Sequence, residues 1–155
     1  MEIISGSVRK TIAVGKFISR NLEKGDIVCL FGELGSGKTV LAKGISSGLG
    51  VRQESVTSPT FVLIRQYKAR IPVFHFDLYR LVCPEDILDL GYEEYLFGEG
   101  ISIIEWADRL GKLLPSEFLK VQLKVAGENK RQLKISARGT RYKKIMGMLR
   151  ENFSH

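Results

Sequence analysis

The chain has 155 residues, of which 44% are hydrophobic and 26% are charged, and its formal net charge at pH 7 is +7. A chain of this size buries a core of its own, so we expect one soluble domain over residues 1–155 and exclude collagen-like, disordered and disulfide-stapled proteins. The sequence has no apolar run of membrane-spanning length and no export signal in its first residues, which predicts a cytoplasmic protein without a membrane partner.

The spacing of apolar residues predicts the first helices and the first strand. Residues 8–23 place apolar side chains on one helical face, and the continuous apolar run of residues 27–31 is typical of a strand buried on both faces. A glycine-rich turn follows, after which Leu41, Ile45 and Leu49 lie on one face of a second helix. The chain is therefore expected to begin with a helix, a buried strand and a second helix.

The middle of the chain alternates strands with a helix. Strands are expected at residues 61–67, 71–76 and 101–105, and a helix is expected at residues 84–90. Strands that alternate with helices are typical of an α/β domain with a mainly parallel sheet flanked by helices.

The C-terminal part follows a different period. Residues 119–125 and 133–137 alternate between apolar and polar side chains, which predicts two half-buried strands of a β-hairpin joined at residues 126–130. A helical stripe of apolar residues then predicts a final helix over residues 142–153.

Charge is unevenly distributed along the chain. Residues 120–150 contain ten Lys and Arg residues against one acidic residue, Glu128, whereas eight acidic residues and no basic ones lie between Arg80 and Arg109. Such blocks are commonly solvated faces, but they also mark surfaces that meet charged partners. Both interpretations of the basic end stay open at this stage.

A phosphate-binding loop is the most specific local signal. The pattern G-x-x-x-x-G-K-[ST] is matched in full by Gly32, Glu33, Leu34, Gly35, Ser36, Gly37, Lys38 and Thr39. Glycines allow backbone N–H groups to turn toward phosphates, and the N-terminus of the following helix adds its positive dipole end. In such a loop, Lys38 reaches the β- and γ-phosphates and Thr39 places its hydroxyl on Mg²⁺. The sequence therefore predicts an α/β domain like those of P-loop NTPases, with a C-terminal hairpin and helix.

Carboxylates end two of the predicted buried strands. A phosphate loop works with a carboxylate that helps to hold its metal ion, placed at the end of a neighbouring strand. Asp77 follows the apolar run of residues 73–76, and Glu105 follows that of residues 101–104, so both fit this position. Because an ionised carboxylate is costly to bury alone, a cation or a hydrogen-bond donor is expected beside each.

Four short segments occur in an order and spacing that are specific in combination. They are residues 33–39, Ser58-Pro59-Thr60-Phe61, His75-Phe76-Asp77-Leu78-Tyr79-Arg80-Leu81 and Glu105-Trp106. Together they resemble the TsaE (YjeE) family of small bacterial ATPases, over residues 10–138. The resemblance implies an ATPase that uses ATP and Mg²⁺, is needed for making threonylcarbamoyladenosine in tRNA, and works with the proteins TsaD and TsaB.

The resemblance also implies roles for individual residues. Lys38 matches the family's phosphate contact, Asp77 matches an acid associated with hydrolysis, and Thr60 lies in a segment similar to a nucleotide-sensing switch. Thr39 and Glu105 match the two residues that hold Mg²⁺. These five residues are the predicted catalytic and metal-binding positions.

The same resemblance extends to the rim of the site. Arg131 resembles a basic residue near the nucleotide, and Thr11 is expected close to the base. Trp106 matches a family tryptophan whose role does not follow from the sequence. The basic segment of residues 120–150 lies outside these motifs, and it is expected either to offer a surface to tRNA or to an acidic face of the partner complex, or only to keep the hairpin and the last helix soluble.

Other functions of a phosphate loop compete with this one. A small-molecule kinase needs an acceptor pocket and an arginine-rich lid, whereas residues 85–110 are acidic. A GTPase is disfavoured because Asn129-Lys130-Arg131-Gln132 lacks the aspartate of the guanine-reading pattern Asn-Lys-x-Asp. In a binding module with incidental turnover, partner binding would survive the loss of hydrolysis.

Overall fold

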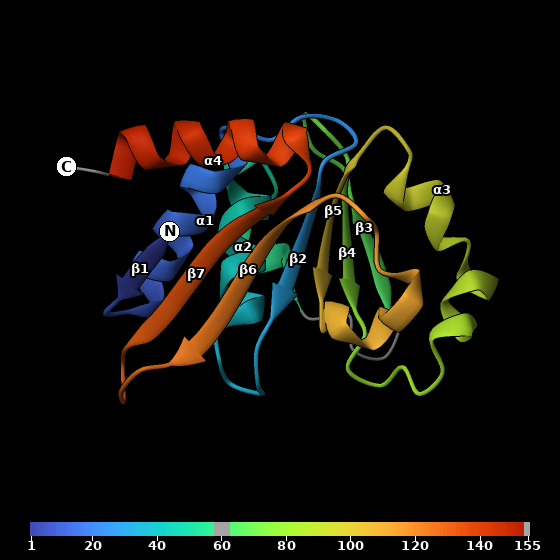
Figure 1. Ribbon diagram of the computed structural model, residues 1–155, viewed down its shortest axis with the longest axis horizontal. Coiled ribbons are helices and arrows are strands. Elements are labelled where there is room, and N and C mark those ends of the chain that lie inside the picture. Colours follow the sequence, from blue (N-terminus) through green and yellow to red (C-terminus); the bar gives the residue numbers. More distant parts are fainter. Residues whose placement is uncertain (58–62, 154–155) are drawn as a thin grey trace.

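The computed structural model describes residues 1–57 and 63–153 (Figure 1). Its strands are β1 (Glu2–Ser5), β2 (Ile27–Phe31), β3 (Ile64–Tyr67), β4 (Val73–Asp77), β5 (Ile101–Glu105), β6 (Phe118–Val125) and β7 (Arg131–Arg138). Its α-helices are α1 (Val8–Ser19), α2 (Lys38–Gly48), α3 (Tyr92–Leu96) and α4 (Thr140–Phe153). Short 3₁₀ helices are η1 (Gln53–Ser55), η2 (Pro84–Leu90) and η3 (Ala107–Leu113).

The strands form one sheet in the order β1-β7-β6-β2-β5-β4-β3. β2 runs parallel to its neighbours β5 and β6, and β5 runs parallel to β4. The pairings of β1 with β7, β7 with β6 and β4 with β3 are antiparallel. The predicted α/β class is confirmed, but the sheet is mixed. The parallel strands form its centre, and antiparallel strands extend both edges.

One face of the sheet is covered by α1, α2 and α4. Figure 1 shows α1 and α2 behind the strands, with α4 along one end of β7. Side chains such as Leu30, Ile103 and Val121 from the strands meet Ile18 and Ile45 from the helices in one buried cluster. This layer fixes α2 against β2, and the loop between these two elements is the predicted phosphate loop.

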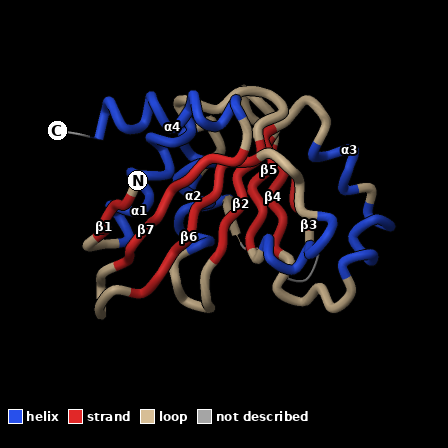
Figure 2. Tube along the Cα trace, in the orientation of Figure 1, coloured by secondary structure: helices blue, strands red, loops and turns tan. Residues whose placement is uncertain are grey.

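The opposite face is covered over only part of its width. η2, α3 and η3 contribute to a second buried cluster on β2, β4 and β5, which includes Cys29, Phe76 and Ile104. Over β6 and β7, side chains on this face such as Lys124 and Lys134 are exposed. Figure 2 shows these two strands at the front of the molecule, beside the covered part of the sheet.

The start of α4 is attached to the start of β2 by polar contacts. Arg141 donates hydrogen bonds to both carboxylate oxygens of buried Asp26, at 2.8 and 3.2 Å. The Tyr142 hydroxyl accepts a hydrogen bond from the Ile27 N–H at 2.8 Å. Burial raises the pKa of Tyr142 to about 12, so its hydroxyl stays neutral at physiological pH. Arg141 is therefore a structural residue of the basic segment.

Several elements differ from the sequence-based expectation. β1, α3 and η3 are not anticipated, because a four-residue edge strand and a five-residue helix show too little periodicity. The predicted helix at residues 84–90 is the 3₁₀ helix η2. Residues 61 and 62 of the predicted strand at 61–67 lie outside the described residues. Within the described part of the chain, no helix is long and apolar enough to cross a bilayer.

Candidate active site

The loop between β2 and α2 has the conformation that its glycines permit. Gly32, Gly35 and Gly37 all have positive φ angles, of 150°, 80° and 103°, which residues with a Cβ rarely adopt. A Cβ on Gly32 would also lie 2.6 Å from the Leu123 carbonyl oxygen on β6. The loop therefore depends on glycine both for its turn and for its close approach to the sheet.

Lys38 begins α2 and is almost fully buried inside this loop. Its ammonium group donates hydrogen bonds to the carbonyl oxygens of Gly32 at 2.6 Å and Glu33 at 2.8 Å, and to the Ser36 hydroxyl at 3.4 Å. The same nitrogen lies 4.0 Å from the centre of the Trp106 ring. Burial lowers the pKa of Lys38, and nearby carboxylates, Glu105 foremost, oppose this shift.

Thr39, Glu105 and His75 form a buried chain of polar contacts. The Thr39 hydroxyl donates to one carboxylate oxygen of Glu105 at 2.8 Å. The other oxygen lies 2.5 Å from Nε2 of His75, whose side chain is fully buried. His75 Nδ1 has no hydrogen-bond partner within the described residues. The sequence predicts a partner for Glu105, and the structure identifies Thr39 and His75 as that pair.

Asp77 lies beside Glu105 because their strands are neighbours. Asp77 at the end of β4 is directly opposite Glu105 at the end of β5 in the parallel register. The Tyr79 N–H donates to an Asp77 carboxylate oxygen at 3.0 Å, which helps to fix the orientation of the carboxylate. Both carboxylates are thus at the carboxyl ends of parallel strands, next to the loop that follows β2.

A cleft of about 610 Å³ brings most of the predicted residues together. Its lining includes Thr11, Leu34, Gly35, Gly37, Lys38, Thr39, Asp77, Glu105 and Arg131. Gly32, Glu33 and Ser36 do not line the cleft and instead hold the Lys38 ammonium group. Thr60, the predicted switch residue, lies outside the described residues.

Other parts of the lining were not predicted. Gly6, Ser7 and Val8 contribute the start of α1, and Glu128 and Asn129 contribute the turn of the hairpin. Ser7 is the N-cap of α1 and accepts a hydrogen bond from the Lys10 N–H. A serine before an apolar pattern predicts where the helix starts, but it does not predict that this start lies beside the phosphate loop. Sheet topology, which brings the hairpin next to β2, supplies this wall of the cleft.

Trp106 has a distinct structural role at the cleft. Its φ angle is 57°, in the left-handed region, which costs a residue with a side chain roughly 1–2 kcal/mol. This turn after β5 places the indole ring against Lys38 and 5.0 Å from the Tyr79 ring. Trp106 and Tyr79 thus form an aromatic wall next to the buried ammonium group.

The chain is similar to known proteins over most of its length. The family model described as threonylcarbamoyl adenosine biosynthesis protein TsaE matches residues 5–133. The chain belongs to the TsaE family. A TsaE protein from Treponema pallidum is 38% identical over 136 residues, which cover 88% of this chain and all of that protein. The Bacillus subtilis TsaE is 37% identical over 137 residues, which cover 88% of this chain and 85% of that protein.

A solved structure also resembles this TsaE-family chain. The crystal structure of YdiB from Bacillus subtilis superposes with a TM-score of 0.83 at 31% sequence identity. The match covers 98% of this chain and 95% of YdiB, so it includes the C-terminal hairpin and α4. The predicted family and fold class are both confirmed.

Proposed function

We propose that this TsaE-family protein binds and hydrolyses ATP with Mg²⁺, and that it serves tRNA threonylcarbamoyladenosine biosynthesis together with TsaD and TsaB. The observation that carries the proposal is the convergence of Lys38, Thr39, Asp77 and Glu105 on one cleft at the phosphate loop. The relatives from Treponema pallidum and Bacillus subtilis are both named tRNA threonylcarbamoyladenosine biosynthesis proteins, which supports the pathway.

The loop and α2 would bind the phosphates of ATP. Backbone N–H groups of the glycine-rich turn and the N-terminal end of the 11-residue helix α2 favour negative charge at this position. Lys38 would exchange its contacts with the loop carbonyls for the β- and γ-phosphates. Its positive charge would then stabilise the charge that develops during phosphoryl transfer.

Thr39 and Glu105 fit the needs of Mg²⁺. Both supply hard oxygen ligands, and Mg²⁺ in nucleotide sites is held by one or two protein groups together with phosphates and water. Among residues 1–57 and 63–153, no group of three or more His, Cys, Asp or Glu residues is placed to hold a metal without such help. When bound, Mg²⁺ would neutralise charge on the phosphates, and Asp77 would orient the attacking water.

Replacement of the two carboxylates should separate these roles. Glu105→Ala is expected to weaken Mg²⁺-dependent nucleotide binding, because it removes a metal ligand. Asp77→Asn keeps an oxygen that accepts from the Tyr79 N–H, so it should lower turnover more than affinity. Calorimetry with and without Mg²⁺, combined with a steady-state phosphate-release assay, measures both quantities. Equal losses of binding and turnover in both variants would contradict this division.

His75 should act as a positioning residue for Glu105. His75→Leu removes the contact to the Glu105 carboxylate and is expected to raise the Mg²⁺ concentration needed for nucleotide binding by about ten- to a hundredfold. His75→Gln, which keeps an N–H donor, should retain more of the metal affinity. A purely structural role would instead lower thermal stability in both variants with an unchanged Mg²⁺ requirement.

The proposed partners are tested with purified proteins. This chain, TsaD and TsaB are mixed with ATP or without nucleotide, and complex formation and tRNA modification are measured. We expect a complex that depends on ATP and modification that stops when this chain is omitted. Full modification without this chain would contradict the proposed role, whereas partner binding that survives the loss of hydrolysis would favour a binding module.

A further inference from the structure

Part of the sheet presents a basic surface that the proposed ATPase does not use. On β6 and β7, alternate residues point away from α1 and α2, because the intervening ones are buried. We call this surface the open sheet face and define it by Lys120, Gln122, Lys124, Gln132, Lys134 and Ser136. These side chains line a depression of about 660 Å³.

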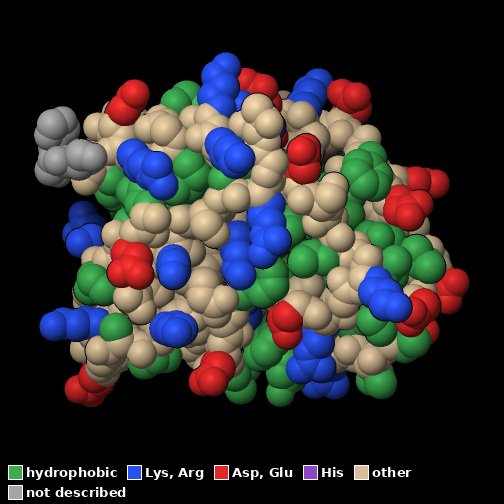
Figure 3. All heavy atoms as spheres, viewed as in Figure 1, with side chains coloured by type: hydrophobic (Ala, Val, Ile, Leu, Met, Phe, Trp, Pro, Cys, Tyr) green, Lys and Arg blue, Asp and Glu red, His purple; other side chains and the backbone are tan. Residues whose placement is uncertain are grey.

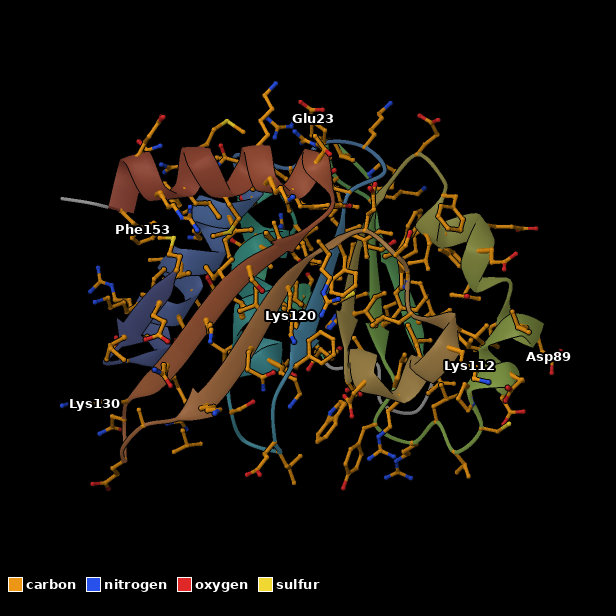
Figure 4. The ribbon with its side chains drawn as sticks, in the orientation of Figure 1. Glu23, Asp89, Lys112, Lys120, Lys130 and Phe153 are labelled. Carbon is orange, nitrogen blue, oxygen red and sulfur yellow. The ribbon has the colours of Figure 1, made fainter. Side chains whose placement is uncertain are left out.

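The three lysines of the open sheet face are regularly spaced. Lys120 and Lys124 lie on the same side of β6, about 13 Å apart at about 3.3 Å per residue. Lys134 of β7 is directly opposite Gln122, which lies midway between Lys120 and Lys124 on β6. Figure 4 labels Lys120 on this face, and Figure 3 shows several separate Lys and Arg side chains over this part of the sheet.

Positive charge is in excess on this surface, although Glu2 of β1 is directly opposite Lys134 of β7 in the register. None of the ion pairs seen among the described residues involves Lys120, Lys124 or Lys134. Among the described residues, Glu2 is the one acidic residue that lines the depression, and Gln132 donates a hydrogen bond to it at 3.3 Å. The Lys120 ammonium group lies 4.9 Å from the centre of the Phe31 ring. Three like charges at this spacing favour a polyanion.

The structure divides the basic segment of residues 120–150 into separate surfaces. Arg141 pairs with Asp26, and Arg131 lines the candidate active site. Lys143 and Lys144 are exposed on α4, whose buried residues belong to the core on the other side of the sheet. The open sheet face is therefore a distinct group of lysines. Within the described chain, it shares no lining residue with the candidate active site.

We propose that the open sheet face binds the phosphate backbone of RNA. The fully buried centre of a protein interface is rich in apolar side chains, whereas the side chains that define this surface are polar and its apolar neighbours, Ile4 on β1 and Phe31 on β2, lie at its two edges. Lysines interleaved with amide and hydroxyl side chains are the groups that contact phosphates and sugars. The inference rests on the proposed function, in which tRNA is the molecule that is modified, so tRNA is the RNA to test.

The experiment compares two triple variants that lose equal charge. Lys120→Gln, Lys124→Gln and Lys134→Gln alter the open sheet face. Lys16→Gln, Lys68→Gln and Lys143→Gln serve as the control, because these three lysines are exposed elsewhere. Affinity for unmodified transcribed tRNA is measured by fluorescence anisotropy over a range of salt concentrations, without nucleotide. ATP hydrolysis and thermal stability are measured alongside for each variant.

We expect the open-face variant to lose affinity for tRNA by about tenfold or more at low salt, with unchanged basal hydrolysis. Each phosphate contact contributes about 0.7 to 0.9 to the slope of log affinity against log salt, so the slope should fall by about 2 to 3. The control variant should lose distinctly less tRNA affinity, and its salt slope should fall by less. This RNA measurement is independent of ATP, so its outcome is separate from that of the ATPase proposal.

Other outcomes would overturn the proposal. Equal losses in the two triple variants would indicate a diffuse effect of net charge. Unchanged tRNA affinity together with weaker binding to TsaD and TsaB would assign the open sheet face to a protein partner. Unchanged tRNA affinity with loss of self-association, measured by light scattering, would assign it to a second copy of this chain.

Discussion

Lys38→Ala is expected to lower ATP hydrolysis by a factor on the order of 10² to 10³, because it removes a preorganised positive charge from the transferring phosphoryl group. The ammonium group is already held inside the loop by the carbonyl oxygens of Gly32 and Glu33. It would exchange these contacts for the phosphates when nucleotide binds, and a positive charge positioned at the loop in this way contributes strongly to the rate. Phosphate release at saturating MgATP measures the effect on turnover.

A matched control separates this loss from a general effect of charge. Lys43→Ala removes the same charge from the same helix, and Lys43 does not line the cleft. We expect wild-type turnover in this variant. Thermal unfolding of both variants tests whether Lys38→Ala also loosens the loop, to which its ammonium group donates hydrogen bonds. Wild-type turnover in Lys38→Ala would show that this loop is not the active site.

The local parts of the site are well predicted from the sequence. The phosphate loop is encoded in consecutive residues, and its glycines have the positive φ angles that the motif implies. Asp77 and Glu105 are found because a carboxylate at the end of an apolar run has a clear pattern. Their side-by-side position then follows from parallel pairing of β4 and β5. Short-range sequence signals are therefore sufficient to predict the part of the cleft formed by the phosphate loop and these two carboxylates.

The other half of the cleft depends on long-range pairing. β6 pairs in parallel with β2, so the hairpin turn with Asn129 and the start of β7 with Arg131 come next to the loop. The alternation in residues 119–125 predicts a strand but gives no indication of its neighbour. The role of His75 also depends on long-range pairing. Its apolar strand context favours a histidine of the core, and only the register of β4 against β5 places its ring beside Glu105.

Gly44→Ala should test how closely the two helices behind the sheet are packed. α1 and α2 approach each other at Gly15 and Gly44, both without a side chain. A Cβ on Gly44 would lie 2.9 Å from the Cα of Ile12 and closer still to its carbonyl oxygen, and these are backbone atoms that cannot rotate away. We expect the free energy of unfolding to fall by about 2–3 kcal/mol. That corresponds to a decrease of about 4–12 °C in Tm.

The same substitution at Gly147 should have the opposite sign. Gly147 lies on the exposed side of α4, and nothing is within 4 Å of a Cβ at this position. Alanine there gains helix propensity of about 0.5–1 kcal/mol without a clash, so Tm should rise. Differential scanning calorimetry of the two variants compares them directly. Equal stability of Gly44→Ala and the wild type would mean that α1 and α2 can move apart without a loss of folding free energy.

The clash at Gly44 should also affect the active site. α2 is a single helix from Lys38 to Gly48, so a shift forced at Gly44 is transmitted to its first turn. Lys38 and Thr39 occupy that turn, and Thr39 must stay within hydrogen-bond reach of Glu105 on β5. Gly44→Ala is therefore expected to weaken Mg²⁺-dependent nucleotide binding even at temperatures where the protein is fully folded. Gly147→Ala, on a helix that does not line the cleft, should leave that binding unchanged.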